Sequence, residues 1–423
     1  MHTMNTLPNG IRVSSSVMTE RSSASIGVWI GCGGRYEKKH EAGISHFLEH
    51  MLFKGTKRRG CEELKRTIEG MGGSFNGFTA EEFTCYLVKV PAEGLRLSVD
   101  VLTDMVFSPK LSVEELEKER HVIIEEIKMY QDMPISLVED NLQQLMWPKN
   151  PLGQLLTGTP ETVSAINRKA LTAAHRTCYV PNNISVVGCG ALDQMHLEEI
   201  IGQFTECHQP SVLQPFKKAV TIQNKPAMFL QRKETEQTRI ALGFHAIPRT
   251  SPHAIASNLL NIILGGNMSS RLFHEVREKR GLVYDIHSSC KKFSDTGMFV
   301  ISAGTEQKLA SKTIRVILHE LEKIKKDNIA QRELKRAKEY YIGQMKLSLE
   351  NTMDRMIWLG EKIITNTQVE EPNDVFKKIA RITAEELTEL ARDIFAFNKR
   401  NLSVVGNVTD QGETNIRKTL EYA

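Results

Sequence analysis

The spacing of apolar and polar positions along this 423-residue chain predicts strands and helices that follow one another throughout. The run ASIGVWIG, from Ala24, is apolar at most positions, as a buried strand is. We expect strands at Ile11–Ser16, Ser25–Gly31, Thr84–Val90 and Ile184–Gly188, and helices at Cys61–Gly70, Gly94–Phe107, Ser112–Tyr130 and Ile135–Met146. Because several strands are close in sequence, the expected fold class is α+β, a mixed, mainly antiparallel sheet with helices packed on one side.

The pattern of the first half returns in the second half at a constant offset. The segment NISVVG at Asn183 recurs as NLSVVG at Asn401, and the charged helix around Glu115 aligns with the one around Glu333, each 218 residues later. Buried strands and charged helices can resemble each other by chance, but a shared offset argues for duplication. We expect two homologous halves, residues 1–207 and 220–423, joined by the proline-containing linker 208–219.

Composition changes this picture little and excludes some functions. Hydrophobic content of 40%, charged content of 25% and a net charge of +4 are typical of a globular protein and favour neither nucleic acid nor a membrane as partner. The N-terminal residues show no secretory or transit signal, although a cleaved one would be missing. Seven scattered cysteines without a C-x-x-C motif predict reduced thiols in a cytoplasm-like compartment.

The segment EAGISHFLEHMLF, residues 41–53, contains the most specific chemical motif, H-x-x-E-H. On a helix, His46 and His50 lie on one face, where two imidazoles can bind one Zn²⁺. Glu49 lies beside them and can accept a proton from the attacking water. The alternative is an amphipathic core helix with two hydrogen-bonded histidines; the apolar residues around the motif suit both interpretations.

A catalytic zinc needs a third protein ligand, and the helix predicted at Ser112–Tyr130 offers two carboxylates on one face, Glu119 and Glu126. From the residues alone, a glutamate on a charged helix is equally well explained as a solvated side chain. The positions 218 residues after His46, His50 and Glu126 are Leu264, Met268 and Gln344, which are not typical zinc ligands. The sequence therefore predicts one metal site per chain, in the first half.

The chain resembles the pitrilysin-type (M16) zinc metallopeptidases, and in particular bacterial homologues of the mitochondrial processing peptidase β-subunit. The motifs that carry the resemblance are GISHFLEHMLFKGT, GGSFNGFT, ERHVIIEEIKMYQDMP and GGNMSSRLFHEVREKRGLVY, which together extend over nearly the whole chain. The resemblance implies that His46, His50 and Glu126 bind zinc and that Glu49 is the base. It also implies that Glu119 supports the site by orienting a histidine ligand.

The resemblance further implies substrate-binding residues in both halves, which in this family close on each other as a clam shell. Arg277 and Tyr284 match the R-x6-Y pair and are expected to contact the peptide and stabilise its oxyanion, although by themselves they would be explained as an exposed charge and a core residue. Asn76 and Phe78 lie in the segment expected to form the edge strand where extended substrate docks. Gly77 replaces the usual alanine there.

Specificity for basic residues stays open at this point. Asp132, Glu139 and Asp140 follow the third ligand, but Ile135–Ser136 stands where a further carboxylate is expected from the family. We therefore expect a zinc-dependent endopeptidase, with one Zn²⁺ per chain, that hydrolyses unfolded peptides or presequence-like segments. A homodimer is expected by family analogy. The resemblance to bacterial members, with the predicted reduced thiols, implies a cytoplasmic location in a bacterium; the alternative is the mitochondrial matrix, if a transit peptide is missing. The alternative is a non-catalytic scaffold or partner subunit of the same fold, which would lack the H-x-x-E-H motif.

Overall fold

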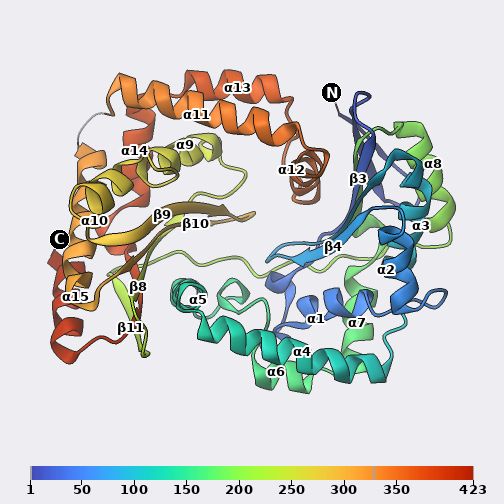
Figure 1. Ribbon diagram of the computed structural model, residues 1–423, viewed down its shortest axis with the longest axis horizontal. Coiled ribbons are helices and arrows are strands. Elements are labelled where there is room, and N and C mark those ends of the chain that lie inside the picture. The colour runs from blue at the N-terminus through green and yellow to red at the C-terminus, as the bar shows by residue number, and fades with distance from the viewer. Residues whose placement is uncertain (1, 327–328, 423) are drawn as a thin grey trace. The chain divides into compact units, whose positions relative to one another are not determined.

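The computed structural model describes residues 2–326 and 329–422 and divides into two compact units, each with its own sheet (Figure 1). Unit 1 comprises residues 1–127, 154–217 and 346–371, and unit 2 comprises residues 128–153, 218–345 and 372–423. The predicted α+β class is confirmed, because both units contain a mixed sheet that carries helices. In the described part of the chain, no helix is long and apolar enough to cross a membrane.

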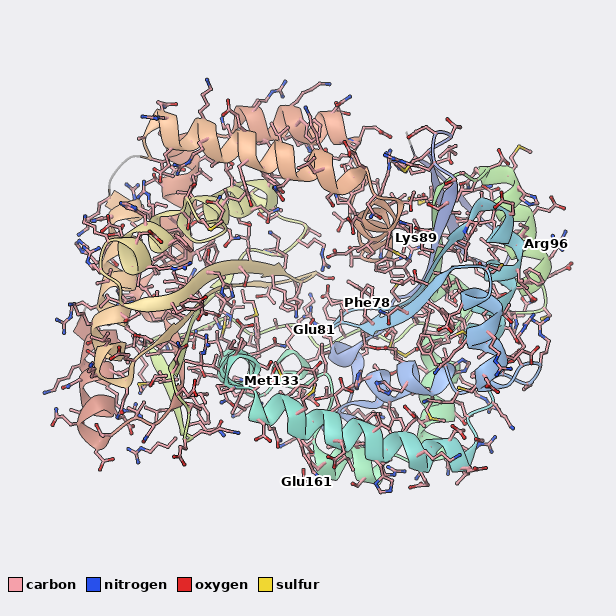
Figure 2. All side chains as sticks on the ribbon, in the orientation of Figure 1. Phe78, Glu81, Lys89, Arg96, Met133 and Glu161 are labelled. Carbon is pink, nitrogen blue, oxygen red and sulfur yellow. A yellow bond between two sulfur atoms is a disulfide. The ribbon has the colours of Figure 1, made fainter. Side chains whose placement is uncertain are left out.

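Unit 1 contains a six-stranded sheet in the order β1-β2-β6-β3-β5-β4. Its strands are β1 (Thr3–Thr6), β2 (Arg12–Val17), β3 (Ser23–Ile30), β4 (Ser74–Thr79), β5 (Thr84–Pro91) and β6 (Ile184–Gly190). Only the β2–β6 pair among these is parallel. β4 is bonded to β5 on one side and forms an edge of the sheet, which leaves its other side open to an added strand. Figure 2 labels Phe78 on β4 and Lys89 on β5.

The helices of unit 1 cover both faces of this sheet. They are α1 (Ile44–Leu52), α2 (Cys61–Glu69), α3 (Leu95–Phe107), most of α4 (Val113–Asp132), α6 (Pro160–Ala165), α7 (Arg168–Cys178), α8 (Gln194–Thr205) and α12 (Thr352–Ile364). Val28 faces the large core with α1 and α3, whereas the next residue, Trp29, packs with Met356 and Leu359 of α12. Coverage of both faces explains why β3 is apolar at successive positions. The prediction that helices pack on one side of the sheet is therefore wrong for unit 1.

Unit 2 repeats this sheet with five strands in the order β7-β11-β8-β10-β9. The strands are β7 (Ala227–Arg232), β8 (Thr238–Ala246), β9 (Val283–Lys292), β10 (Gly297–Thr305) and β11 (Asn401–Gly406). The helices are α5 (Pro134–Met146), α9 (Ala254–Leu264), α10 (Ala310–Lys326), α11 (Gln331–Leu349, its last residues in unit 1), α13 (Pro372–Arg381), α14 (Ala384–Ile394) and α15 (Asp410–Tyr422). β11 is parallel to β7 and antiparallel to β8, as β6 is to β2 and β3.

Two equivalent helices of the repeat, α5 and α12, are exchanged between the units: α5 lies in the first half of the sequence but belongs to unit 2, and α12 lies in the second half but belongs to unit 1. α5 and α12 begin 218 residues apart, and α5 packs on β8 and β11 of unit 2 while α12 packs on β3 and β6 of unit 1. Each compact unit therefore contains one helix from the other part of the sequence. The division into homologous halves at 207 and 220 describes the sequence repeat and stays a prediction.

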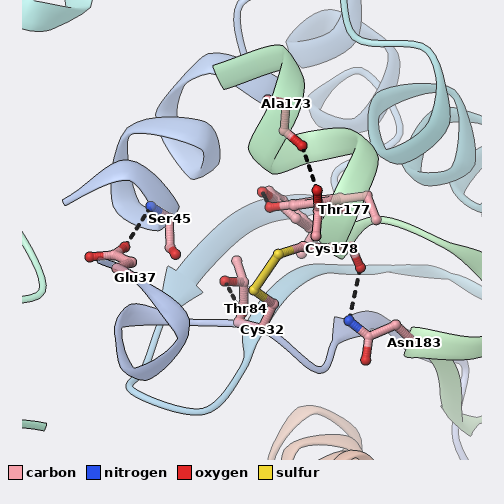
Figure 3. Close-up of a disulfide and its surroundings, with 10 residues drawn as sticks. Cys32, Glu37, Ser45, Thr84, Ala173, Thr177, Cys178 and Asn183 are labelled. Carbon is pink, nitrogen blue, oxygen red and sulfur yellow. Dashed lines mark hydrogen bonds between the residues drawn. A yellow bond between two sulfur atoms is a disulfide. The ribbon is translucent and has the colours of Figure 1, made fainter. Parts of the chain in front are cut away.

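A disulfide joins Cys32, just after β3, to Cys178 at the end of α7 (Figure 3). The prediction that all cysteines are reduced is therefore wrong for this pair. The two residues are 146 positions apart in sequence, and their Cα atoms lie 5.9 Å apart, so only the fold brings them together. The other cysteines, Cys61, Cys85, Cys189, Cys207 and Cys290, are free.

Candidate metal centre

The two histidines of helix α1 lie together on one face of the helix, because the residues on its other faces are buried in the hydrophobic core. Phe47, Leu48, Met51 and Leu52 are at most 2% exposed, whereas His46 and His50 are only partly buried. The imidazole centroids lie 4.7 Å apart, one helical turn along the axis. Gly43 precedes the helix with φ +92, a left-handed conformation that favours glycine at this entry.

The third member of the cluster comes from α4, in the part of that helix that belongs to unit 1. Oε2 of Glu126 lies 3.8 Å from Nε2 of His46 and 3.6 Å from Nε2 of His50. Bonds of about 2.0–2.1 Å in a tetrahedral zinc site separate two ligand atoms by roughly 3.3 Å, so the three donors need to move little. Within residues 2–326 and 329–422, His46, His50 and Glu126 are the one group of three such side chains arranged to hold a metal ion.

The protonation state of His46 also suits the role of a metal ligand. Burial, together with the neighbouring His50, lowers the pKa of His46 to about 4, so this imidazole is neutral near pH 7 and offers a lone pair. Its Nδ1 is buried and has no hydrogen-bond partner among the described residues. Zinc binds the neutral form of histidine. His46 is neutral, and its Nε2 lies close to His50 and to the Glu126 carboxylate, as in a zinc site.

Glu119 lies beside the cluster and contacts His50. Its Oε2 is 3.0 Å from Nδ1 of His50, and its Oε1 forms an ion pair with the ammonium group of Lys54. Burial by itself would raise the pKa of Glu119, but the hydrogen bonds from His50 and Lys54 lower it overall. An ionised Glu119 accepts the Nδ1–H of His50, which leaves Nε2 free to bind metal.

Glu49 occupies the position expected of a base. Its Oε2 accepts a hydrogen bond of 2.7 Å from the hydroxyl of Thr79, the last residue of β4. Burial raises the pKa of Glu49, Glu126 adds to the rise, and both Thr79 and His50 oppose it. The Glu49 carboxylate is therefore held against the edge strand by a hydrogen bond that the H-x-x-E-H motif does not reveal.

The edge strand β4 presents alternate residues to the two faces of the sheet. A Cβ added to Gly77 would lie 3.3 Å from Oε1 of Glu49 and 3.0 Å from the Phe53 ring, so this position is crowded on the side of the base. Phe78 faces the opposite side and contacts Trp29 and Phe83, at centroid distances of 5.8 and 6.3 Å. Asn76 accepts the backbone N–H of Gly77 through its own side chain.

Arg277 and Tyr284 lie together in unit 2. Arg277 belongs to a π-helical segment, Phe273–Glu278, and its guanidinium lies 5.4 Å from the centre of the Tyr284 ring, near the start of β9. Tyr284 is 74% exposed, which is unusual for an aromatic residue on a strand. It lines a cavity of about 500 Å³ in unit 2, together with Asp132, Ile135, Glu236 and Arg239.

Sequence reasoning missed two residues that support the centre. Lys54 follows α1 in the run FKGT, and Thr79 ends the run FNGFT, yet neither run reveals the partner of its side chain. A lysine or a threonine within a motif carries no signal of these contacts, because they form between elements far apart in sequence. The motifs indicate only that these segments belong to the functional region, and not which side chains contact each other.

The geometry defines a class of site: two histidines and a glutamate that could hold a metal ion, with the further carboxylate of Glu49 between this group and an open sheet edge. Two family descriptions match the chain, "Insulinase (Peptidase family M16)" over residues 12–160 and "Peptidase M16 inactive domain" over residues 165–341. The chain belongs to peptidase family M16. The family and the class of enzyme predicted from the sequence, a metallopeptidase, are thereby confirmed.

Relatives and solved structures agree with this assignment. The chain is 33% identical to an uncharacterized zinc protease of Bacillus subtilis, over 92% of this chain and 95% of the relative, and 32% identical to one of Streptomyces coelicolor, over 96% and 90%. The crystal structure of a protease from Helicobacter pylori superposes with a TM-score of 0.90 at 22% identity, covering 96% of this chain and 99% of that one. At that identity the structural likeness shows the fold alone.

Proposed function

We propose that this protein is a zinc metalloendopeptidase that hydrolyses unfolded peptides, with one zinc ion held by His46, His50 and Glu126. The observation that carries the proposal is the convergence of these three donors beside Glu49 and the open edge of β4. The names of the bacterial relatives, which are zinc proteases, support zinc as the metal. Retention of this complete set of groups argues against a non-catalytic scaffold.

When bound at this centre, zinc supplies Lewis acidity that activates water for attack on a peptide carbonyl. Glu49 accepts the proton of the attacking water and passes it to the leaving amine. Its raised pKa brings it closer to the working pH, and the Thr79 hydroxyl holds the carboxylate in place. Glu119 fixes the orientation of the His50 ring.

The edge of β4 is the proposed docking surface for substrate. An extended peptide can add to this edge as a further strand and form main-chain hydrogen bonds, which do not depend on side-chain identity. Gly77 and Thr79 face the same side as Glu49, so a peptide on this edge lies next to the base. Phe78 supports the strand from the opposite face, and Asn76 shapes its backbone.

Arg277 and Tyr284 are proposed to contact the peptide and to stabilise the developing oxyanion, as the family motif implies. Their mutual contact and the exposure of Tyr284 support this role. Cleavage of presequence-like segments, a homodimeric state and a cytoplasmic location are further predictions. The disulfide bears on the location, because disulfides are rare in reducing compartments.

The proposed function is tested with a mixed peptide library, with mass spectrometry of the products. We expect internal cleavage of many sequences, loss of all cleavage after chelation, and recovery on addition of one equivalent of zinc per chain. Unchanged cleavage with chelator, or two zinc ions per chain by metal analysis, would contradict the proposal. Light scattering of the same preparation tests the homodimer.

A further inference from the structure

A buried carboxylate that takes no part in the proposed chemistry sits at the start of α1. Glu37 is 6% exposed; its Oε2 accepts the backbone N–H of Gly43 and its Oε1 accepts that of Ser45, both at 2.8 Å. Figure 3 shows the bond to Ser45. Gly43 is the N-cap of α1 and has no side chain to cap it, so Glu37 satisfies helix-start donors from outside the helix.

Glu37 is itself held in place by the segment before it. The short 3₁₀ helix Gly34–Tyr36 is tied to the turn after β4, because Gly34 N–H donates to the carbonyl of Ala80 and Arg35 N–H to that of Glu81. The buried Arg35 side chain forms a 2.6 Å ion pair with Glu82. The turn that follows β4 therefore anchors Glu37, which in turn caps the start of α1.

The start of α1 is also fixed from the opposite direction. The hydroxyl of Thr162 donates to the carbonyl of Ala42, and a Cβ at Gly158 would lie 2.3 Å from that carbonyl oxygen, so the two segments are in close contact. His46 follows Ser45 directly and lies in the first turn of the helix. Any shift of this turn moves His46 away from Glu126, whereas His50 lies one turn further and has Glu119 to hold it.

We propose that Glu37 is a positioning residue for the metal centre: it fixes the first turn of α1 and thereby places His46 for zinc. The inference rests on the proposed function. Burial raises the pKa of Glu37, the hydrogen bonds from Ser45 and Gly43 oppose this rise, and the nearby Glu41 adds to it, so that the pKa lies at about 7. Burying a carboxylate is costly, but Glu37 satisfies two donors at once, the N–H of the N-cap Gly43 and that of Ser45, whereas a serine or asparagine side chain at the N-cap would accept only from the first turn of the helix.

The test compares zinc affinity with fold stability in the full chain. For Glu37→Ala, we expect the zinc dissociation constant, measured by competition with a chromophoric chelator, to rise roughly 2- to 30-fold, the range that loss of a helix cap allows. Glu37→Gln keeps one acceptor oxygen and should lose less. In both variants, peptide cleavage should fall at limiting zinc and kcat should recover at saturating zinc, with KM unchanged.

Asp193→Ala supplies the matched control, because Asp193 caps α8 in the same unit through the N–H of His196, away from the metal centre. It should lower the unfolding temperature of the metal-free protein without changing zinc affinity. Equal zinc affinity in wild type, Glu37→Ala and Glu37→Gln, or an equal loss in Asp193→Ala, would overturn the inference while leaving the proposed function intact. If Glu37→Ala does not fold, Glu37→Gln decides by the same readout. A wild-type protein that binds no zinc would overturn both.

Discussion

Nδ1 of His50 lies 3.0 Å from Oε2 of Glu119, and this contact determines which nitrogen of the histidine can face a metal. The Lys54 ammonium pairs with the other oxygen and helps to keep Glu119 ionised. The carboxylate therefore accepts the Nδ1 proton, and Nε2 points toward Glu126 at 3.6 Å. The His50 ring thus connects α1 to α4, so a substitution of Glu119 should change the affinity of the site for metal.

Glu119→Gln should weaken zinc binding on the order of 10- to 100-fold, as loss of outer partners of metal ligands does elsewhere. The amide can present an N–H instead of an acceptor to His50, which disturbs the tautomer. Equilibrium zinc titration of the purified variant measures the effect. Glu117→Gln is the control, because Glu117 is exposed on the same helix and pairs with Arg120. Similar affinities for the two variants would contradict the role assigned to Glu119.

Glu49→Gln should retain zinc and lose turnover by roughly 100- to 10,000-fold, the contribution that a positioned general base makes. The substitution keeps the size of the side chain and leaves His46, His50 and Glu126 in place. Metal analysis and kcat with a fluorogenic peptide are measured on the same sample. Near-normal kcat with a full complement of zinc would show that another group is the base.

Thr79→Val should shift the acid limb of the kcat/KM profile to higher pH. The Thr79 hydroxyl donates to Glu49 and opposes the rise of its pKa caused by burial. Without that hydroxyl the pKa of Glu49 rises further, so the base is protonated, and inactive, up to a higher pH. Thr79→Ser keeps the hydroxyl and should follow the wild-type profile. Superimposable profiles for Thr79→Val and wild type would exclude this contact from catalysis.

Local periodicity predicted the fold well where an element is defined by its own sequence. The helix predicted at Gly94–Phe107 is observed as Leu95–Phe107, and the repeat at Ile184 and Asn401 appears as equivalent strands with the same pairing. The exchange of α5 and α12 between units could not be predicted, because an amphipathic helix shows that it has a buried face but not which sheet covers it.

The candidate site was predictable only as far as neighbouring residues in the sequence define it. The spacing of His46 and His50 by one helical turn identifies a pair of donors directly. Glu126 was distinguishable from other glutamates of α4 only through the family resemblance, since its partners lie 76 or more residues away in sequence. The Cys32–Cys178 disulfide depends on the folded chain in the same way, because its residues are 146 positions apart. The Glu37 cap joins residues only six and eight positions apart, and it was missed because no capping motif marks it.

Thiol titration tests the disulfide. Under denaturing, non-reducing conditions we expect five free thiols per chain, rising to seven after reduction, because Cys32 and Cys178 are joined and the remaining cysteines are free. Cys32→Ser with Cys178→Ser should give the same five thiols with and without reductant. Seven thiols before reduction would favour the fully reduced chain that the sequence predicts. The comparison is made on protein purified without reductant.

The last prediction concerns unit 2, where no group of three metal-ligating side chains occurs among the described residues. Tyr284→Phe removes a single hydroxyl from a ring that is 74% exposed, so the fold should be unaffected. If that hydroxyl donates to the oxyanion, kcat should fall on the order of 10- to 1000-fold with little change in KM. Arg277→Ala should weaken both binding and turnover, because it removes a cation and also the contact that orients the Tyr284 ring.

Two controls make this prediction decisive. Tyr340→Phe removes a hydroxyl from a partly exposed tyrosine on α11 of the same unit and should leave kcat unchanged. Zinc content is matched across all variants, so that a loss of kcat reports on the substrate and not on the metal. A Tyr284→Phe enzyme indistinguishable from wild type and from Tyr340→Phe would show that the phenol has no part in the reaction, and Arg277 would then have to act through binding alone.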